Sequence, residues 1–214
     1  MKIIRINSTE EAIQKATNEI EGDNPRVCLT GGNFGGVLLD AWIEKDLDIS
    51  SWEVFLTDER ITLSKREQNS TILHDKLSRL TAFDKSRFNI FQQASELDDV
   101  ISEITAKLSS ENILNFDISF LSLGEDGHLA GHFQNSNSLS DTRFCYTDKA
   151  SKKPRGRISF NVDWLMLSTK VILVVLGEEK EIALSELISG KGIHSNIWDF
   201  KNLVLITDIP LEVT

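Results

Sequence analysis

Cysteine and proline are scarce in this sequence, which has two cysteines and three prolines among 214 residues. Cys28 lies in an apolar run typical of a strand, and this favours a reduced, packed thiol over a disulfide. With so little proline and only twelve glycines, no stretch has the composition of a long linker or a low-complexity segment. Since this length buries a substantial core, we expect residues 1–214 to form a single α/β domain.

Basic residues are also in short supply: 23 Lys and Arg stand against 33 Asp and Glu, for a net charge of −10. Sequence-independent binding to nucleic acid needs basic patches, so this class of function is excluded. No Lys/Arg cluster suits an anionic membrane, and no apolar run is long enough to cross a bilayer. The N-terminus turns acidic too early for a secretory signal, so we expect a cytoplasmic protein without nucleic-acid or membrane partners.

Several motifs of cofactor binding are missing. The glycine-rich stretch at residues 31–36 follows a strand and precedes a helix, but its spacing is not GxGxxG and it lacks the GK[ST] ending of a P-loop. No His/Cys spacing indicates zinc, and no internal repeat is visible.

Apolar strand-like runs alternate with amphipathic helical stretches along the chain. The first helix is predicted to begin with a capping box, in which Glu11 follows Ser8 by three positions. This alternation predicts an α/β fold with a largely parallel sheet flanked by helices on both faces, a Rossmann-like arrangement. The expected strands are residues 3–6, 27–30, 52–56, 88–91, 117–123, 143–146, 157–162, 171–176 and 203–207, and the expected helices are residues 8–20, 37–47, 70–80, 96–108 and 178–188.

Residues 117–128, DISFLSLGEDGH, are the most informative segment. An apolar strand ends abruptly in Gly124-Glu125-Asp126-Gly127-His128. Glycines permit tight turns, and open α/β sheets bind small ligands at the carboxyl ends of their strands. The turn would therefore bring two carboxylates and an imidazole, the side chain best suited to proton transfer near neutral pH, to a ligand-binding edge. A strand–helix junction with a solvated acidic loop is the alternative.

Other loops that follow or precede strands carry groups suited to an anion. Successive glycines at residues 30–36 expose backbone N–H groups at a helix N-terminus. Arg60 follows a strand directly and would present a planar fork to a phosphate. Residues 152–157, KKPRGR, are the densest basic patch and lead into a strand. Plain turns or solvated loops remain the alternatives for all three segments.

Lys180 follows a buried strand in Gly177-Glu178-Glu179-Lys180. A lysine in the first turn of a helix opposes the helix dipole by roughly 0.3–1 kcal/mol, which indicates another task for its ammonium group. An ordinary exposed lysine is the alternative.

Taken in order, these segments resemble the 6-phosphogluconolactonase family between about residues 26 and 188. The family has glycines after a strand, a strand ending in DER followed by Asn, a strand ending in G-x-DGH, an R-[IV]-[ST]-[LF] strand and a GxxK turn. The matching residues here are Leu29-Thr30-Gly31-Gly32, Asp58-Glu59-Arg60, Asn69, Gly124 to His128, Arg157-Ile158-Ser159-Phe160, and Gly177 to Lys180.

The resemblance implies hydrolysis of 6-phospho-D-glucono-1,5-lactone in the oxidative pentose phosphate pathway, without metal or organic cofactor. His128 would be the general base that activates water, oriented by Asp126 or Glu125. The implied ligand is a small-molecule sugar phosphate, bound by a monomer or a small homo-oligomer. The implied substrate- and phosphate-binding residues are Gly31, Gly32, Asn33, Asp58, Arg60, Asn69, Arg157 and Lys180.

The sequence departs from the family pattern in three places. Residues 33–36, NFGG, replace a Thr-Pro continuation, residues 129–134, LAGHFQ, replace TASLFP, and no Pro-x-Ser element is recognisable in residues 192–196. The altered glycine loop leaves a non-catalytic sugar-phosphate-binding regulator as an alternative function. A glucosamine-6-phosphate deaminase-like enzyme, whose family has the same fold and a DGH-like turn, is another.

We assign no catalytic or metal-binding role to the other three histidines. His132 would share a helical face with His128 at i+4, but no third metal ligand accompanies the pair. We expect His74 and His194 to be ordinary surface or helix residues.

Overall fold

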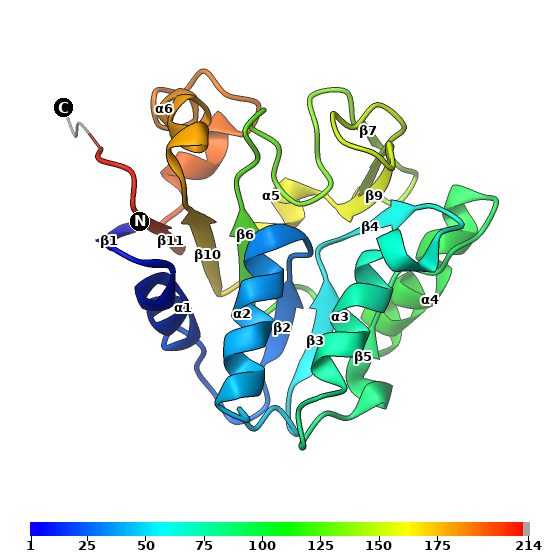
Figure 1. The fold of residues 1–214 in the computed structure, drawn as a ribbon. Coiled ribbons are helices and arrows are strands. Elements are labelled where there is room, and N and C mark those ends of the chain that lie inside the picture. Colours follow the sequence, from blue (N-terminus) through cyan, green and yellow to red (C-terminus); the bar gives the residue numbers. More distant parts are fainter. Residues whose placement is uncertain (212–214) are drawn as a thin grey trace.

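The computed structural model describes residues 1–211 and contains two sheets (Figure 1). Seven parallel strands form the larger sheet in the order β1-β11-β10-β6-β2-β3-β5. Their bounds are β1 Lys2–Arg5, β2 Arg26–Leu29, β3 Glu53–Leu56, β5 Phe88–Asn89, β6 Ile118–Ser122, β10 Lys170–Val175 and β11 Leu203–Thr207. A small antiparallel sheet has the order β4-β9-β8-β7, with β4 Asp58–Ile61, β7 Asn137–Ser138, β8 Phe144–Thr147 and β9 Gly156–Phe160.

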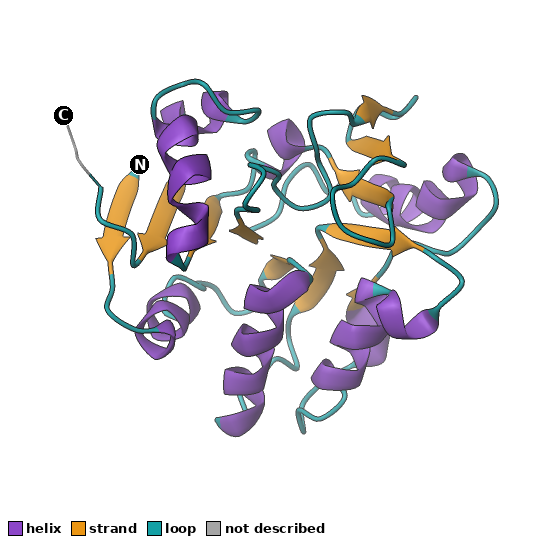
Figure 2. Ribbon diagram, turned by 45° about the horizontal axis from the view of Figure 1, so that its top comes forward, coloured by secondary structure: helices purple, strands orange, loops and turns teal. Residues whose placement is uncertain are grey.

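Helices flank the parallel sheet. Figure 2 shows α1, α2 and α3 together on one side of it, and α4 and α5 lie behind it in Figure 1. The bounds are α1 Thr9–Thr17, α2 Gly32–Glu44, α3 Asn69–Leu77, α4 Leu97–Ser110, α5 Val162–Leu165 and α6 Glu181–Ile188. Short 3₁₀ turns occupy Lys65–Glu67, Lys85–Arg87, Glu178–Lys180 and Ser195–Asp199. The predicted fold class, a largely parallel sheet between helices, is confirmed.

Local signals in the sequence explain many of the element ends. The predicted cap of α1 is formed, since Ser8 Oγ accepts a hydrogen bond from the Glu11 N–H at 3.2 Å. The aliphatic runs of β10 and β11 are buried because helices cover the sheet. Both cysteines, Cys28 and Cys145, are free and buried. No helix within residues 1–211 has both the length and the apolar character needed to cross a bilayer.

Two segments differ most clearly from the prediction. The segment after β3 was expected to be a loop, but Asp58–Ile61 is strand β4, which pairs with β9 so that Arg60 lies opposite Arg157. Three charged residues in a row carry no strand signal, and only the partner strand makes this segment extended. Helix α2 begins at Gly32 rather than near residue 37, because the glycines that suggested a loop form its first turn.

An aromatic cluster joins the two sheets. The ring of Phe160 in β9 lies 5.3 Å from that of Phe116, 4.9 Å from that of Phe144 and 4.8 Å from that of Trp164 in α5. Edge-to-face and stacked pairs at these separations add to the burial of apolar area. Phe160 therefore connects the small sheet to the main core.

Replacing Phe160 with alanine tests this connection. Because the ring is fully buried, the Phe160→Ala variant should lose about 3–5 kcal/mol of unfolding free energy in urea titrations. Leu114→Ala, at a side chain that is 71% exposed, is the control and should change it by less than about 0.5 kcal/mol. A Phe160→Ala loss as small as that of the control would contradict the connecting role.

Candidate functional site

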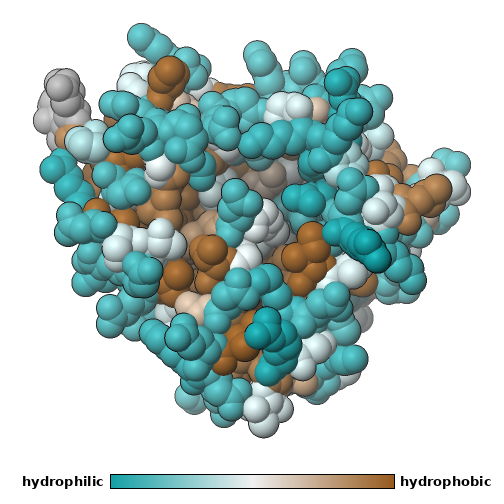
Figure 3. Space-filling view, viewed as in Figure 1, coloured by the Kyte–Doolittle hydropathy of each residue, from teal (hydrophilic) through white to brown (hydrophobic). Residues whose placement is uncertain are grey.

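A pocket of about 460 Å³ opens at the carboxyl ends of β2, β6 and β10, where the small sheet meets the parallel one. In Figure 3 it is a hollow near the centre of the view, below a band of hydrophilic residues. Parallel strands leave their following loops at this edge, so segments far apart in the chain converge there.

All of the predicted site residues except Asp126 line this pocket. They come from six places: the start of α2, strand β4, the start of α3, the 124–128 turn, strand β9 and the turn before α6. The lining members are Gly31, Gly32, Asn33, Asp58, Arg60, Asn69, Glu125, His128, Arg157 and Lys180. Asp126 lies directly behind one of them, His128, which it contacts.

The His128 imidazole is fixed on two sides. Its Nδ1 hydrogen-bonds Asp126 Oδ1, and its ring stacks on that of Phe133 with the centroids 4.2 Å apart and the planes 18° apart. Burial raises the pKa of Asp126, but hydrogen bonds from His128 and Ser151 outweigh it, so the net shift is downward and the carboxylate is anionic near neutrality. An anionic acceptor holds the proton on Nδ1, which leaves Nε2 as a free base.

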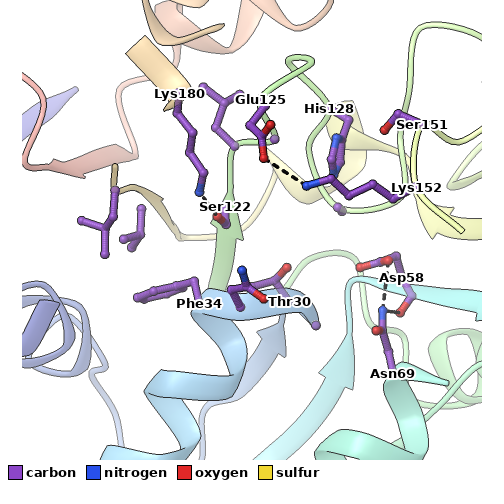
Figure 4. Close-up of a pocket in the computed structure, with 18 of the residues that line it drawn as sticks. Thr30, Phe34, Asp58, Asn69, Ser122, Glu125, His128, Ser151, Lys152 and Lys180 are labelled. Atoms are coloured by element: carbon purple, nitrogen blue, oxygen red, sulfur yellow. Dashed lines mark hydrogen bonds and ion pairs between the residues drawn. The ribbon is translucent and has the colours of Figure 1, made fainter. Parts of the chain in front are cut away.

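Glu125 and Asp126 interact with different residues. Its Oε1 pairs with Lys152 Nζ at 3.0 Å, an ion pair between two exposed side chains (Figure 4). Of the two candidate carboxylates, only Asp126 contacts the imidazole.

Gly124 is required by the close approach of His128. A Cβ built on Gly124 would overlap the imidazole ring. Gly127, between Asp126 and His128, has φ +81°, a conformation that favours glycine. The two glycines of the GEDGH turn therefore have separate structural causes.

A buried carboxylate orients the Asp58–Asn69 side of the pocket. Glu59 is 0% exposed and accepts hydrogen bonds from the Asn69 and Ser70 N–H groups at 2.6 and 2.8 Å, which caps the N-terminus of α3. Burial raises the pKa of Glu59, and these hydrogen bonds partly offset the rise. The cap fixes Asn69 at the pocket wall.

Asn69 is held against Asp58 and keeps one buried acceptor unpaired. Its Nδ2 donates to Asp58 O and Asp58 Oδ2, each at 3.1 Å (Figure 4). Its Oδ1, on a residue only 2% exposed, has no hydrogen-bond partner within the described chain. A buried acceptor without a donor carries a desolvation cost, and almost none of the surface of this oxygen is accessible.

The cations divide between structural and available groups. Arg157 is buried, and its guanidinium donates to the backbone carbonyls of Lys152 at 3.3 Å, Gly156 at 2.9 Å and Pro154, so it holds the 152–156 loop. Burial lowers the pKa of Arg157, while the nearby Asp58 raises it. The Arg60 guanidinium donates one such hydrogen bond, from Nη1 to Glu67 O at 3.2 Å.

Lys180 is the least committed of these cations. Its Nζ lies 3.4 Å from Ser122 Oγ (Figure 4), and no carboxylate of residues 1–211 forms an ion pair with it. Burial lowers the pKa of Lys180, with Glu179 and Glu125 opposing the change. An ammonium group without a counterion at a pocket wall is suited to an anionic ligand.

Sequence reasoning missed several lining residues. Ser122, Ser151, Phe34 and Phe133 were not predicted, and nothing in their local sequence marks them. Lys152 and Lys153 also line the pocket, and the basic composition of residues 152–157 was the one available signal.

Two expectations about histidines are wrong. Residues 128–132 form a tight turn with bridges between Leu123 and Leu129 and between Leu129 and His132, so His128 and His132 do not share a helical face. His194 is 4% exposed rather than a surface residue. His74 lies on α3 and is partly exposed, as expected. Within residues 1–211, no group of three or more His, Cys, Asp or Glu side chains is arranged to hold a metal ion.

A family model described as "Glucosamine-6-phosphate isomerases/6-phosphogluconolactonase" matches residues 5–196. The chain is 29% identical over 181 residues to "Probable 6-phosphogluconolactonase 2" of Oryza sativa subsp. indica, covering 76% of this chain and 65% of that protein. It is thus aligned with less than two thirds of the length of this plant relative. It is 26% identical over 232 residues to "Glucosamine-6-phosphate deaminase" of Malacoplasma penetrans (strain HF-2), covering 95% of this chain and 94% of that one.

Solved structures with the same fold include both a 6-phosphogluconolactonase and a glucosamine-6-phosphate deaminase. The 6-phosphogluconolactonase of Thermotoga maritima superposes with a TM-score of 0.82 at 19% identity, covering 96% of each chain. A monomeric glucosamine-6-phosphate deaminase gives 0.77 at 17% identity, covering 97% of each. At these identities the likeness establishes the fold alone.

The contact between Gly124 and His128 generates a test. In the Gly124→Ala variant the new methyl group should displace the imidazole and break its hydrogen bond to Asp126. The downfield Nδ1–H proton signal of His128 in NMR spectra should then disappear. Gly36→Ala is the matched control, because a Cβ there meets nothing closer than 4.0 Å, and its signal should persist. Retention of the signal in Gly124→Ala would contradict the steric argument.

Proposed function

This chain belongs to the family of glucosamine-6-phosphate isomerases and 6-phosphogluconolactonases, and we propose that it hydrolyses 6-phospho-D-glucono-1,5-lactone to 6-phosphogluconate. One observation carries the proposal: an imidazole held by a carboxylate shares a pocket with cations at distant positions of its wall. Such a pocket can bind a phosphate at one end of a small molecule and deliver a base to the other. Its volume of about 460 Å³ falls in the range of small-molecule sites.

The chemical step assigns one proton transfer to His128. Nε2 removes a proton from water, and the resulting hydroxide attacks the lactone carbonyl to give a tetrahedral oxyanion. The oxyanion collapses, the bond from the carbonyl carbon to the ring oxygen breaks, and the imidazolium returns its proton to the leaving oxygen. A lactone is an activated ester, so general-base assistance of roughly 10²–10⁴-fold is sufficient without a covalent nucleophile.

The remaining groups hold the substrate. Lys180 and Arg60 supply charge-assisted hydrogen bonds to the phosphate, and the backbone N–H groups at the start of α2 add further donors. The carboxyl group of Asp58 is an acceptor for sugar hydroxyl groups rather than for phosphate oxygens. Fixing the phosphate and the hydroxyls aligns the carbonyl with the water, which contributes several kcal/mol to the rate acceleration.

Deamination of glucosamine 6-phosphate is the alternative. It is favoured by the alignment with the Malacoplasma penetrans deaminase along nearly the whole chain. Against it, Gly131-His132-Phe133 offers no further acidic residue just after His128. Supplying both substrates to the same preparation separates the two functions, because only the deaminase releases ammonia. Binding of 6-phosphogluconate without either turnover would support a non-catalytic regulator instead.

Removing the imidazole tests the base. We expect His128→Ala to lower kcat for the lactone by about 10²–10⁴-fold while 6-phosphogluconate still binds, because the phosphate contacts remain. The lactone hydrolyses spontaneously, so turnover is measured with a rapid coupled assay that generates the lactone in place. His74→Ala, at a histidine outside the pocket, should leave kcat unchanged. Wild-type turnover in His128→Ala would rule out the proton-transfer role.

Neutralising the cations tests the phosphate site. Lys180→Met and Arg60→Ala should each raise KM by roughly 10–100-fold with a smaller effect on kcat, since each removes a charge-assisted hydrogen bond worth about 1.5–3 kcal/mol. Steady-state kinetics measure both constants. Lys191→Met, at an exposed lysine outside the pocket, should leave KM at the wild-type value. An unchanged KM in either pocket variant would remove that residue from the phosphate site.

A further inference from the structure

His194 lies in the loop that follows α6, 4% exposed and behind the turn that carries His128. Its Nε2 lies 3.0 Å from the carbonyl oxygen of His132. A carbonyl only accepts, so Nε2 of His194 carries the proton and donates. Burial is the main cause that lowers the pKa of His194 to about 4. The hydrogen bond to His132 and the charge of Asp163 oppose the shift, whereas charges on His132 and His128 add to it. The donor is thus a neutral imidazole at physiological pH.

The turn that receives this hydrogen bond combines a backbone pair between Leu129 and His132 with a strained residue and two outside contacts. Ala130 has φ +52°, a left-handed conformation that costs a non-glycine residue on the order of 1 kcal/mol. Two outside groups bind the turn: Ser159 Oγ accepts from the Gly131 N–H at 3.1 Å, and His194 donates to the His132 carbonyl. Such a conformation persists only where its surroundings impose it.

The position of the turn is transmitted to His128 through the next residue. Phe133 follows His132 directly and stacks on the His128 ring at 4.2 Å. On the other flank, Ile193 lies near Gly127, since a Cβ added to Gly127 would be 3.6 Å from Ile193 Cγ1. The adjacent pair Ile193-His194 therefore lies beside the chain on both sides of His128.

We propose that Ile193 and His194 form a brace that fixes the orientation of the His128 imidazole, which makes His194 a positioning residue for the general base. The two segments in contact, residues 129–134 and 192–196, are two of the three places where this sequence departs from the family pattern. The kinetic part of this inference rests on the proposed function. The structural part, the orientation of His128, does not.

Two substitutions separate the hydrogen bond from the volume of the ring. His194→Leu fills much of the volume of the ring but removes the donor, whereas His194→Gln retains an N–H donor. We expect His194→Leu to lower kcat for the lactone by about tenfold or more, since a displacement of about 1 Å costs up to about 100-fold. KM and the affinity for 6-phosphogluconate should stay within about twofold, because the brace does not line the pocket. His194→Gln should restore most of kcat, and His74→Leu serves as the control.

NMR of the same variants reports on His128 without any substrate. The Nδ1–H proton signal of the His128–Asp126 hydrogen bond should broaden or vanish in His194→Leu and persist in His194→Gln. If His194→Leu does not fold, Ile193→Ala removes the contact on the other flank and should broaden the same signal. If the wild type proves not to hydrolyse the lactone, the proposed function fails while these signals still decide the brace.

Two results would overturn the brace. One is a folded His194→Leu protein with the wild-type kcat and an unchanged His128 signal. The other is an equal loss in His194→Leu and His194→Gln that affects kcat and KM alike, which is the pattern of general structural damage.

Discussion

The chain passes from the parallel sheet into the small sheet at one buried residue, Thr57, and the pocket depends on that junction. Its N–H donates to Leu29 O at 2.9 Å, which keeps it in register with the parallel sheet. Its carbonyl accepts from the Phe160 N–H at 2.9 Å and from Ser159 Oγ at 3.1 Å, and both donors belong to the small sheet. Within one residue the chain passes from one sheet to the other. Asp58, Glu59 and Arg60 follow at once, and the first and third of these residues line the pocket.

This geometry separates the tasks of the three charged residues that follow Thr57. Asp58 and Arg60 line the pocket, whereas Glu59 points away and caps α3. The cap in turn sets Asn69, whose amide bonds back to Asp58. On the opposite wall, Asp126 and Phe133 hold the His128 ring on its Nδ1 edge and on one face. The pocket walls are thus fixed by contacts among lining residues and by two carboxylates that do not line the pocket, Glu59 and Asp126, which is the preorganisation that an active site requires.

The sequence predicted the parallel sheet and the groups at its carboxyl edge, because strands followed by glycine and charge are local patterns. It could not predict β4, whose extended form comes from pairing with β9, about a hundred residues later in the chain. Nor could it predict that His194 is buried or that Ser122 lies beside Lys180, since both depend on which loops meet in space. The choice between Asp126 and Glu125 likewise needed the turn conformation, because the two residues precede His128 by two and three positions and either could reach it.

The pairing of Arg60 opposite Arg157 has a consequence for the cohesion of the molecule. Like charges directly opposite on neighbouring antiparallel strands repel, and the nearby Asp58 and Glu59 oppose this repulsion. A dianion that entered beside them would cancel the repulsion and tighten the attachment of the small sheet. Resistance to heat and to proteases would then rise with the concentration of such a ligand. The protein without ligand would be the least stable form.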